Sequence, residues 1–226
     1  ARLLLLLGDQ LIRDPGIAVF ELVKNSYDAD SPKATIVMEK LEHPEEGRIV
    51  VEDSGIGMDS KTIINVWLEP GTDYRKKQKE AGKRTPIYKR LPLGEKGVGR
   101  FAAHKLGRKI TLVSRKENKP EVLVEINWED FNQNKPLSRI PVNVVERSPV
   151  IFTGDRTGTR IEVTHLWQAW NRGMVRKLAR AINSICSPFD KKGEFKVEFS
   201  LPDNQEWLKG LMTVPQIMEH ALFKAH

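Results

Sequence analysis

The chain has 226 residues, 39% hydrophobic and 30% charged, which is enough to bury the core of one large domain and excludes a disordered chain. No apolar run approaches the length that a membrane-spanning helix needs, and the single cysteine, Cys186, excludes an internal disulfide framework. We therefore expect a globular, cytoplasmic protein without a membrane partner, whose net charge of +7 allows an anionic ligand or nucleic acid.

The predicted elements alternate between helices and short strands. Capping residues and helical periodicity predict helices over residues 14–29, 60–67, 97–106, 168–185 and 214–223. Apolar and β-branched runs between turn residues predict strands over residues 34–41, 48–53, 109–114, 122–128, 159–164 and 195–200. Residues 131–157, which prolines interrupt, are expected to be irregular. This order predicts an α+β sandwich with a mixed sheet.

A long basic segment separates two of these elements. Residues 68–93 hold several glycines and prolines among many charges and offer no continuous apolar face, so we expect a functional loop or lid over about 68–96. The basic residues here and just beyond are Arg75, Lys76, Lys77, Lys79, Lys83, Arg84, Lys89, Arg90, Lys96, Arg100 and Lys105. The simpler interpretation is a solvated, mobile loop. The functional interpretation is a cover over phosphates or a nucleic-acid contact.

The first predicted helix carries three polar residues on one face. Glu21, Asn25 and Asp28 are spaced i, i+4 and i+7. A carboxylate one turn from an amide suits metal-assisted hydrolysis, because Glu21 can take a proton from an attacking water and Asn25 can complete a magnesium shell. Taken alone, the pattern fits an ordinary amphipathic helix better.

The second strand ends in an acidic, glycine-containing turn. A carboxylate at Asp53 can accept a hydrogen bond from the exocyclic amino group of adenine if the pocket is partly closed. Gly55 and Gly57 let the backbone approach a flat base, and Met58 can supply an apolar wall. The competing interpretation is a simple hairpin turn, in which aspartate and glycine are common.

A glycine-rich motif opens the third predicted helix. Free amides and the positive end of the helix dipole at such a start can hold phosphates. The candidate residues are Gly94, Lys96, Gly97, Val98, Gly99, Arg100 and Phe101. The motif is neither a P-loop nor a dinucleotide fingerprint, and it is also compatible with a lid hinge. Further along, the hydroxyl of Thr159 can reach a base through water, although threonine favours strands in any case.

Together, these four motifs resemble the GHKL superfamily: gyrase B, the large heat-shock chaperone, histidine kinases and MutL. The resemblance covers residues 14 to about 164. Within this range, the four motifs are similar to the family's N box, its two glycine boxes and its late Gly-Thr. It implies the Bergerat fold, a mixed sheet with helices on one face and a lid over ATP. The roles it implies are adenine binding by Asp53 with Thr159, magnesium binding by Asn25, general-base catalysis by Glu21 and phosphate binding by residues 94–99.

The resemblance also guides the choice of branch. Glu21 matches the acid of the hydrolysing branches, and the stretch before it contains no histidine, which argues against histidine kinase activity of this chain alone. The sequences of 20–29 and 53–58 are most similar to the heat-shock-chaperone-like and MORC-like ATPases. In gyrase, MutL and the chaperone, a lysine from a following domain reaches the γ-phosphate, and residues 165–226 are too short for that domain.

We therefore expect an ATP-binding core over residues 1–165 and an extension over 166–226 that packs on it and leads to a missing downstream domain. The expected function is magnesium-dependent ATP hydrolysis, slow in the isolated domain, that gates lid closure and homodimerisation of a larger protein. The alternatives are a non-hydrolysing ATP sensor, separable by phosphate release, and a DNA-associated ATPase of the gyrase, MutL or MORC type that binds nucleic acid through the basic segment.

Overall fold

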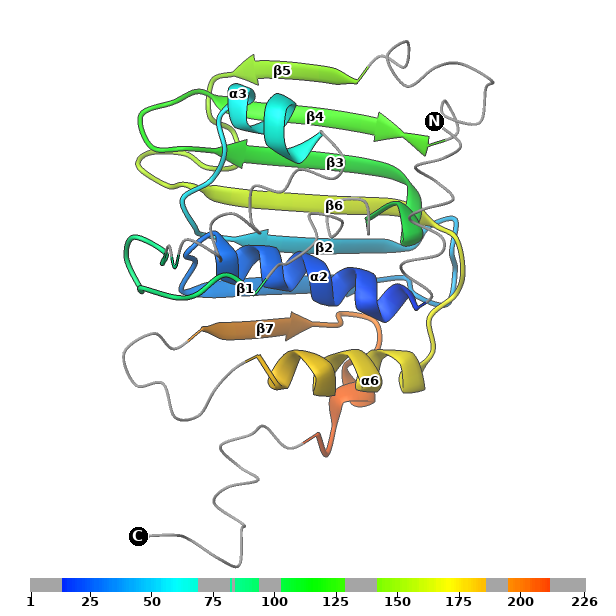
Figure 1. The fold of residues 1–226 in the computed structure, drawn as a ribbon. Coiled ribbons are helices and arrows are strands. Elements are labelled where there is room, and N and C mark those ends of the chain that lie inside the picture. Colours follow the sequence, from blue (N-terminus) through cyan, green and yellow to red (C-terminus); the bar gives the residue numbers. More distant parts are fainter. Residues whose placement is uncertain are drawn as a thin grey trace, which may run out of the picture.

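The computed structural model describes residues 14–68, 82, 84–93, 103–128, 142–185 and 195–211. Its strands are β1 (Lys33–Glu39), β2 (Arg48–Asp53), β3 (Gly107–Arg115), β4 (Glu121–Asn127), β5 (Asn143–Arg147), β6 (Gly158–Leu166) and β7 (Lys196–Ser200). They form one seven-stranded sheet in the order β5-β4-β3-β6-β2-β1-β7 (Figure 1). Only the β1–β7 pair is parallel among the described strands, so the predicted α+β fold with a mixed sheet is confirmed.

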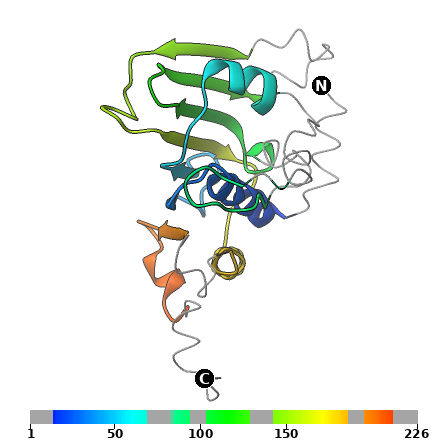
Figure 2. The same ribbon diagram turned by 60° about the vertical axis from the view of Figure 1, so that its left-hand side comes forward.

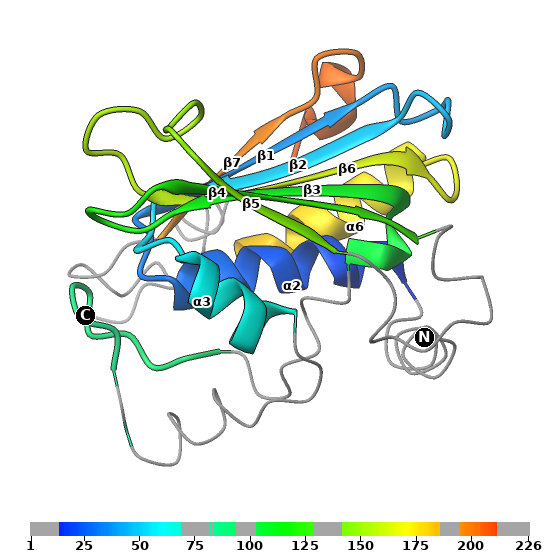
Figure 3. The same cartoon turned by 90° about the horizontal axis from the view of Figure 1, so that it is seen from above.

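The helices cover one face of this sheet. The α-helices are α2 (Pro15–Asp28), α3 (Ser60–Thr62) and α6 (Arg172–Asn183); α3 continues as the π-helical turn η1 (Ile63–Trp67), and η2 (Ala103–Lys105) and η5 (Gln205–Leu208) are short 3-10 turns. Seen from above, α2, α3 and α6 all lie on the same side of the strands (Figure 3). Helix α6 contacts α2 and η5 (Figure 2). None of the described helices is long and apolar enough to cross a membrane.

Helix α2 forms where local signals predict it. The Asp14 carboxylate caps the helix by accepting a hydrogen bond from the Gly16 amide at 2.8 Å, and Pro15 occupies the first turn. The buried residues are Ala18, Val19, Leu22, Val23, Ser26 and Asp28. All but the last two are apolar and pack on the sheet, which leaves Glu21 and Asn25 half-buried at the flank of the helix.

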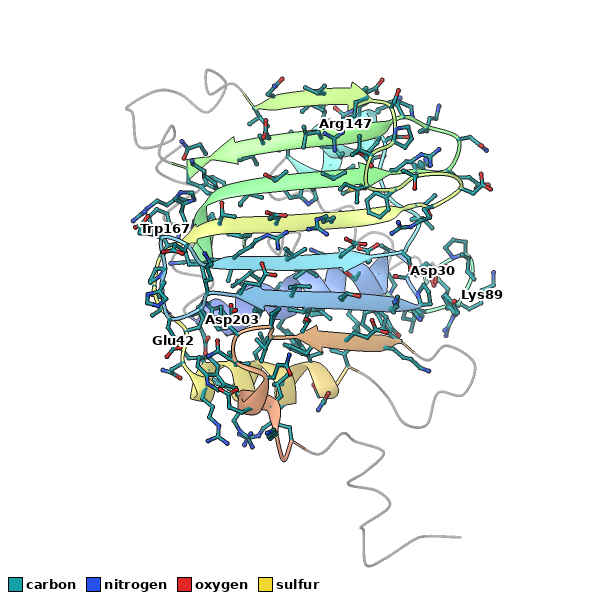
Figure 4. All side chains as sticks on the ribbon, turned by 180° about the vertical axis from the view of Figure 1, so that it is seen from behind. Asp30, Glu42, Lys89, Arg147, Trp167 and Asp203 are labelled. Atoms are coloured by element: carbon teal, nitrogen blue, oxygen red, sulfur yellow. The ribbon has the colours of Figure 1, made fainter. Side chains whose placement is uncertain are left out.

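The two faces of the sheet differ in chemistry. On the helix-covered face, alternate residues such as Ile36 and Val163 are fully buried in the apolar core. The opposite face, drawn in Figure 4, carries a ladder of ion pairs across three strands. Its members, in order of contact, are Glu39, Arg48, Glu162, Arg160 and Glu52. These pairs are partly exposed, so each contributes at most about 1 kcal/mol of stability.

Several boundaries differ from the sequence predictions. Residues 143–147 form β5 within the stretch predicted to be irregular, because β4 pairs with them antiparallel from Glu121 to Glu125. Helix α6 begins at Arg172, four residues later than predicted, because Asn171 caps it by accepting a hydrogen bond from the Met174 amide at 3.0 Å. Of the helix predicted over 97–106, the described part contains only the 3-10 turn η2, and β3 begins at Gly107. The helix predicted at 214–223 lies outside the described residues.

Candidate functional site

A row of three buried polar side chains crosses the end of the helix-covered face. Asp53, the last residue of β2, pairs with Thr159 on β6, and Thr159 pairs with Ser114 on β3. On each strand, the residue two positions away belongs to the apolar core, so all three side chains point to the helix side. Asp53 and Thr159 are each 8% exposed and Ser114 is fully buried. The row is therefore a polar patch within an otherwise apolar layer.

Asp53 is a carboxylate in an unfavourable electrostatic environment. Burial raises the pKa of Asp53 to about 7, because the charged form loses its contact with water. Hydrogen bonds from the Gly55 amide, at 2.9 Å, from the Ser26 hydroxyl and from the Thr159 backbone act in the opposite direction. None of these donors carries a charge, so a ligand that donates a further hydrogen bond would stabilise the ionised carboxylate.

The turn after Asp53 is packed tightly between α2 and β3. A Cβ atom on Gly55 would lie 2.4 Å from the Ala29 carbonyl oxygen, and one on Gly57 would lie 1.9 Å from the Arg115 carbonyl oxygen. Gly57 also has a φ of +63°. Both positions therefore require glycine because the neighbouring backbone leaves no room for a side chain. The sequence analysis had explained these glycines only by the close approach of a flat base. Met58 is half-buried against the apolar core.

Hydrogen bonds fix this turn to the elements around it. The Ile56 amide donates to the Ala29 carbonyl at 2.9 Å, which ties the turn to the end of α2. The Met58 amide donates to Ser114 Oγ at 2.9 Å, and the Thr157 hydroxyl donates to the Gly55 carbonyl at 2.7 Å. The end of α2, the turn and the start of β6 are thus brought together around Asp53.

The three polar residues of α2 have different surroundings. The Glu21 carboxylate forms an ion pair with Lys24 Nζ at 2.8 Å, on the same helix. Asn25, one turn further along, is half-buried. Asp28, in contrast, is buried and accepts a hydrogen bond from the Leu93 amide at 2.7 Å. The side chain of Asp28 therefore holds the end of the basic segment, at Leu93.

Residues 84–93 are docked on the end of α2. The Asp30 carboxylate accepts hydrogen bonds from the amides of Ile87 and Tyr88, at 2.5 and 3.1 Å. Figure 4 shows Asp30 and Lys89 close together beside the carboxyl-terminal end of β2. These contacts are polar, and the large apolar side chains of Ile87, Leu91 and Leu93 are exposed, so the segment is docked without an apolar face of its own.

Arg90 is a buried residue of this docked segment. Its guanidinium donates to the Ser31 carbonyl at 2.6 Å and lies 4.7 Å from the ring centre of Tyr27 and 4.3 Å from that of Tyr88. Arg90 is only 3% exposed. The interpretation of the basic residues as a solvated surface does not apply to Arg90, which stabilises the loop through hydrogen bonds and cation–π contacts.

The proposed phosphate motif lies outside the described residues. Its members are Gly94, Lys96, Gly97, Val98, Gly99, Arg100 and Phe101, and the same holds for most of the basic cluster before it. The turn η2, which follows this motif directly, contacts α2. The described chain thus enters and leaves the motif at α2, since Leu93 is bonded to Asp28 on the other side.

Four contributors to this region were not among the candidate site residues: Ser26, Asp30, Arg90 and Ser114. Ser114 follows Ile110 and Leu112 at the alternate positions of a buried strand, so a polar residue at a core position is the signal that could have found it. Within the described residues, no group of three or more His, Cys, Asp or Glu side chains could hold a metal ion.

Comparison with known proteins agrees with this geometry. A family model described as Histidine kinase-, DNA gyrase B-, and HSP90-like ATPase matches residues 14–159. A comparison with curated proteins found no match. The matched region begins at the cap of α2, ends at Thr159 and contains every candidate site residue. The seven-stranded mixed sheet with three helices is consistent with the Bergerat fold. The chain therefore belongs to the histidine kinase-, DNA gyrase B- and HSP90-like ATPases, the GHKL-type ATP-binding domains.

Proposed function

We propose that this domain binds ATP with its adenine at Asp53 and hydrolyses it with magnesium held at Asn25. The observation that carries the proposal is the buried carboxylate of Asp53, which ends a strand among uncharged hydrogen-bond donors beneath α2. Family membership supports ATP as the ligand. We also propose that the chain lies nearest the heat-shock-chaperone-like and MORC-like branch, which residues 20–29 and 53–58 resemble.

Adenine fits the polar row for a chemical reason. Its exocyclic amino group donates a hydrogen bond that the Asp53 carboxylate can accept, and the bond is strengthened because the acceptor is charged and buried. Thr159 lies on the neighbouring strand and can accept a second bond, directly or through water. Met58 would supply the apolar contact to the base.

Helix α2 would supply the reactive groups. The Asn25 oxygen would complete the coordination of a magnesium ion that takes its other ligands from phosphates and water. Glu21 lies four residues earlier, about 6 Å along the helix, and would accept a proton from the attacking water. The ion pair with Lys24 holds the Glu21 carboxylate in place along the helix. The phosphates would be bound by residues 94–101, with Asp28 fixing the chain that enters that motif.

The nucleotide cycle would act on the rest of the protein through the lid. Residues 84–93, which belong to the proposed lid, are anchored on α2. Homodimerisation of the full-length protein would follow closure, as the resemblance to the GHKL superfamily implies. The domain division at residue 165 is retained as part of this proposal.

The test uses two substitutions in the full-length protein. Glu21→Ala should keep the Kd for ATP within about threefold and lower phosphate release by at least about 100-fold, because only the general base is lost. Asp53→Asn should lose ATP binding, because a neutral amide cannot form the charge-assisted hydrogen bond to the adenine amino group. Glu46→Ala is the matched control, since Glu46 is exposed, pairs with Lys40 and lies in the turn at the other end of β2.

Two outcomes would change the conclusion. Phosphate release by Glu21→Ala at the parent rate would remove the general-base role. ATP binding by the unaltered protein without phosphate release would favour the non-hydrolysing sensor.

A further inference from the structure

Ser114 is a buried hydroxyl at the end of β3 that contacts three groups at once. Its Oγ accepts a hydrogen bond from the Met58 amide, donates one to the Gly158 carbonyl and lies beside the hydroxyl of Thr159, each at 2.9 Å. These groups belong to the turn after β2 and to the start of β6. Ser114 therefore joins both halves of the proposed adenine site.

The single proton of Ser114 determines the direction of the bond to Thr159. A serine hydroxyl has one proton to donate and two lone pairs that accept. The Gly158 carbonyl can only accept, so the Ser114 proton is directed to it, whereas the Met58 amide can only donate. The bond between the two hydroxyls is then donated by Thr159 to Ser114.

This arrangement makes the Thr159 hydroxyl an acceptor toward the base. Its proton is directed at β3, and the hydrogen bond between Thr159 and Asp53 comes from the Thr159 backbone. The two side chains are cross-strand neighbours, and Cβ atoms in such pairs lie about 5 Å apart. One edge of a base can therefore contact both side chains. When Asp53 is ionised, the carboxylate and the Thr159 hydroxyl are both hydrogen-bond acceptors toward that edge.

We propose that Ser114 is a positioning residue that sets base specificity: by taking the Thr159 proton, it makes the site prefer a purine with a 6-amino group over one with a 6-oxo group. This inference rests on the proposed function. A 6-amino group carries two protons and can donate to both acceptors. A 6-oxo purine can donate only from its N1–H, so its oxo oxygen would face an acceptor with no proton between them and would stay unpaired.

The experiment uses calorimetry to measure the Kd of ATP and of ITP for the full chain with magnesium. The two nucleotides differ at the 6 position, which is amino in ATP and oxo in ITP, and in the proton on N1, which only ITP carries. The unaltered protein should prefer ATP by on the order of 100-fold. Ser114→Ala frees the Thr159 proton to donate to a carbonyl, so the preference should fall about tenfold. Ser114→Thr, which keeps the hydroxyl, should restore it. Thr164→Val, a hydroxyl loss on the opposite face of β6, should leave the preference unchanged.

The ratio of the Kd for ITP to the Kd for ATP distinguishes a role of Ser114 in base specificity from a purely structural role. If Ser114 only supports the fold, Ser114→Ala weakens both ligands equally and the ratio stays constant, which overturns the inference. Should Ser114→Ala not fold, Thr159→Val and Thr159→Ser replace it: the valine variant should lose the preference and the serine variant should keep it, and an unchanged ratio in both overturns the inference. Failure of the unaltered protein to bind either nucleotide would instead refute the proposed function.

Discussion

At the scale of single residues, Asp53 shows a conflict between binding and stability. Its pKa rises from 3.8 to about 7 on folding, because burial disfavours the charged form. Between these two pH values the folded protein holds a proton that the unfolded chain has released. The free energy of unfolding therefore falls as the pH rises through this window, and above pH 7 the buried charge lowers stability in full.

Removing the charge should therefore stabilise the nucleotide-free protein. We expect Asp53→Asn to raise the free energy of unfolding at pH 8 by about 2–4 kcal/mol, and by roughly half of that or less at pH 5. Denaturant unfolding at the two pH values measures the difference. An equal gain at both would mean that burial does not control the ionisation of Asp53.

At the scale of elements, the turn after β2 can be tested by comparing two glycines, Gly57 and Gly154. Gly57 and Gly154 have nearly the same φ, +63° and +61°, so the backbone strain of an alanine is the same at both. They differ in space, because a Cβ atom on Gly57 would overlap the Arg115 carbonyl oxygen, whereas one on Gly154 has no atom within 4 Å.

The expected effects of the two substitutions differ accordingly. Gly154→Ala should cost about 1 kcal/mol of stability, from the left-handed backbone alone. Gly57→Ala should cost about 3 kcal/mol or more and should also weaken ATP binding, because the turn must move away from β3. Thermal unfolding and a nucleotide titration of both variants provide the readout. Similar losses for the two variants would show that the turn adapts to a side chain.

The elements that sequence predicts well are those whose signals are local. The Asp14-Pro15 cap and the apolar run of β2 determine their own conformation, so α2 and β2 lie where they were expected. Strand β5 depends on pairing with β4, and its own residues are mostly exposed, so its sequence carries little periodic signal.

The candidate site follows the same division. Glu21, Asn25 and Asp53 belong to contiguous motifs, and sequence alone could propose them, although their roles stay predictions. Ser114 and Arg90 act through neighbours 45 and 59 residues away along the chain, Thr159 and Ser31. Such partners are defined only once strand order and loop docking are known, which a single sequence does not provide.

At the scale of the whole molecule, one sheet unites the ATPase core with the chain that follows it. The family match ends at Thr159, yet β7 pairs with β1 at one edge, and α6 shares the apolar core with α2. The residues after the match therefore contribute to the layer that supports Asn25 and Glu21.

The most direct measurement is a crystal structure of the protein with magnesium and a non-hydrolysable ATP analogue. The account predicts the exocyclic amino group of adenine within hydrogen-bonding distance of the Asp53 carboxylate, and the metal coordinated by the Asn25 side chain on the same face of the sheet. A nucleotide bound elsewhere, or a base that leaves Asp53 without contact, would contradict it.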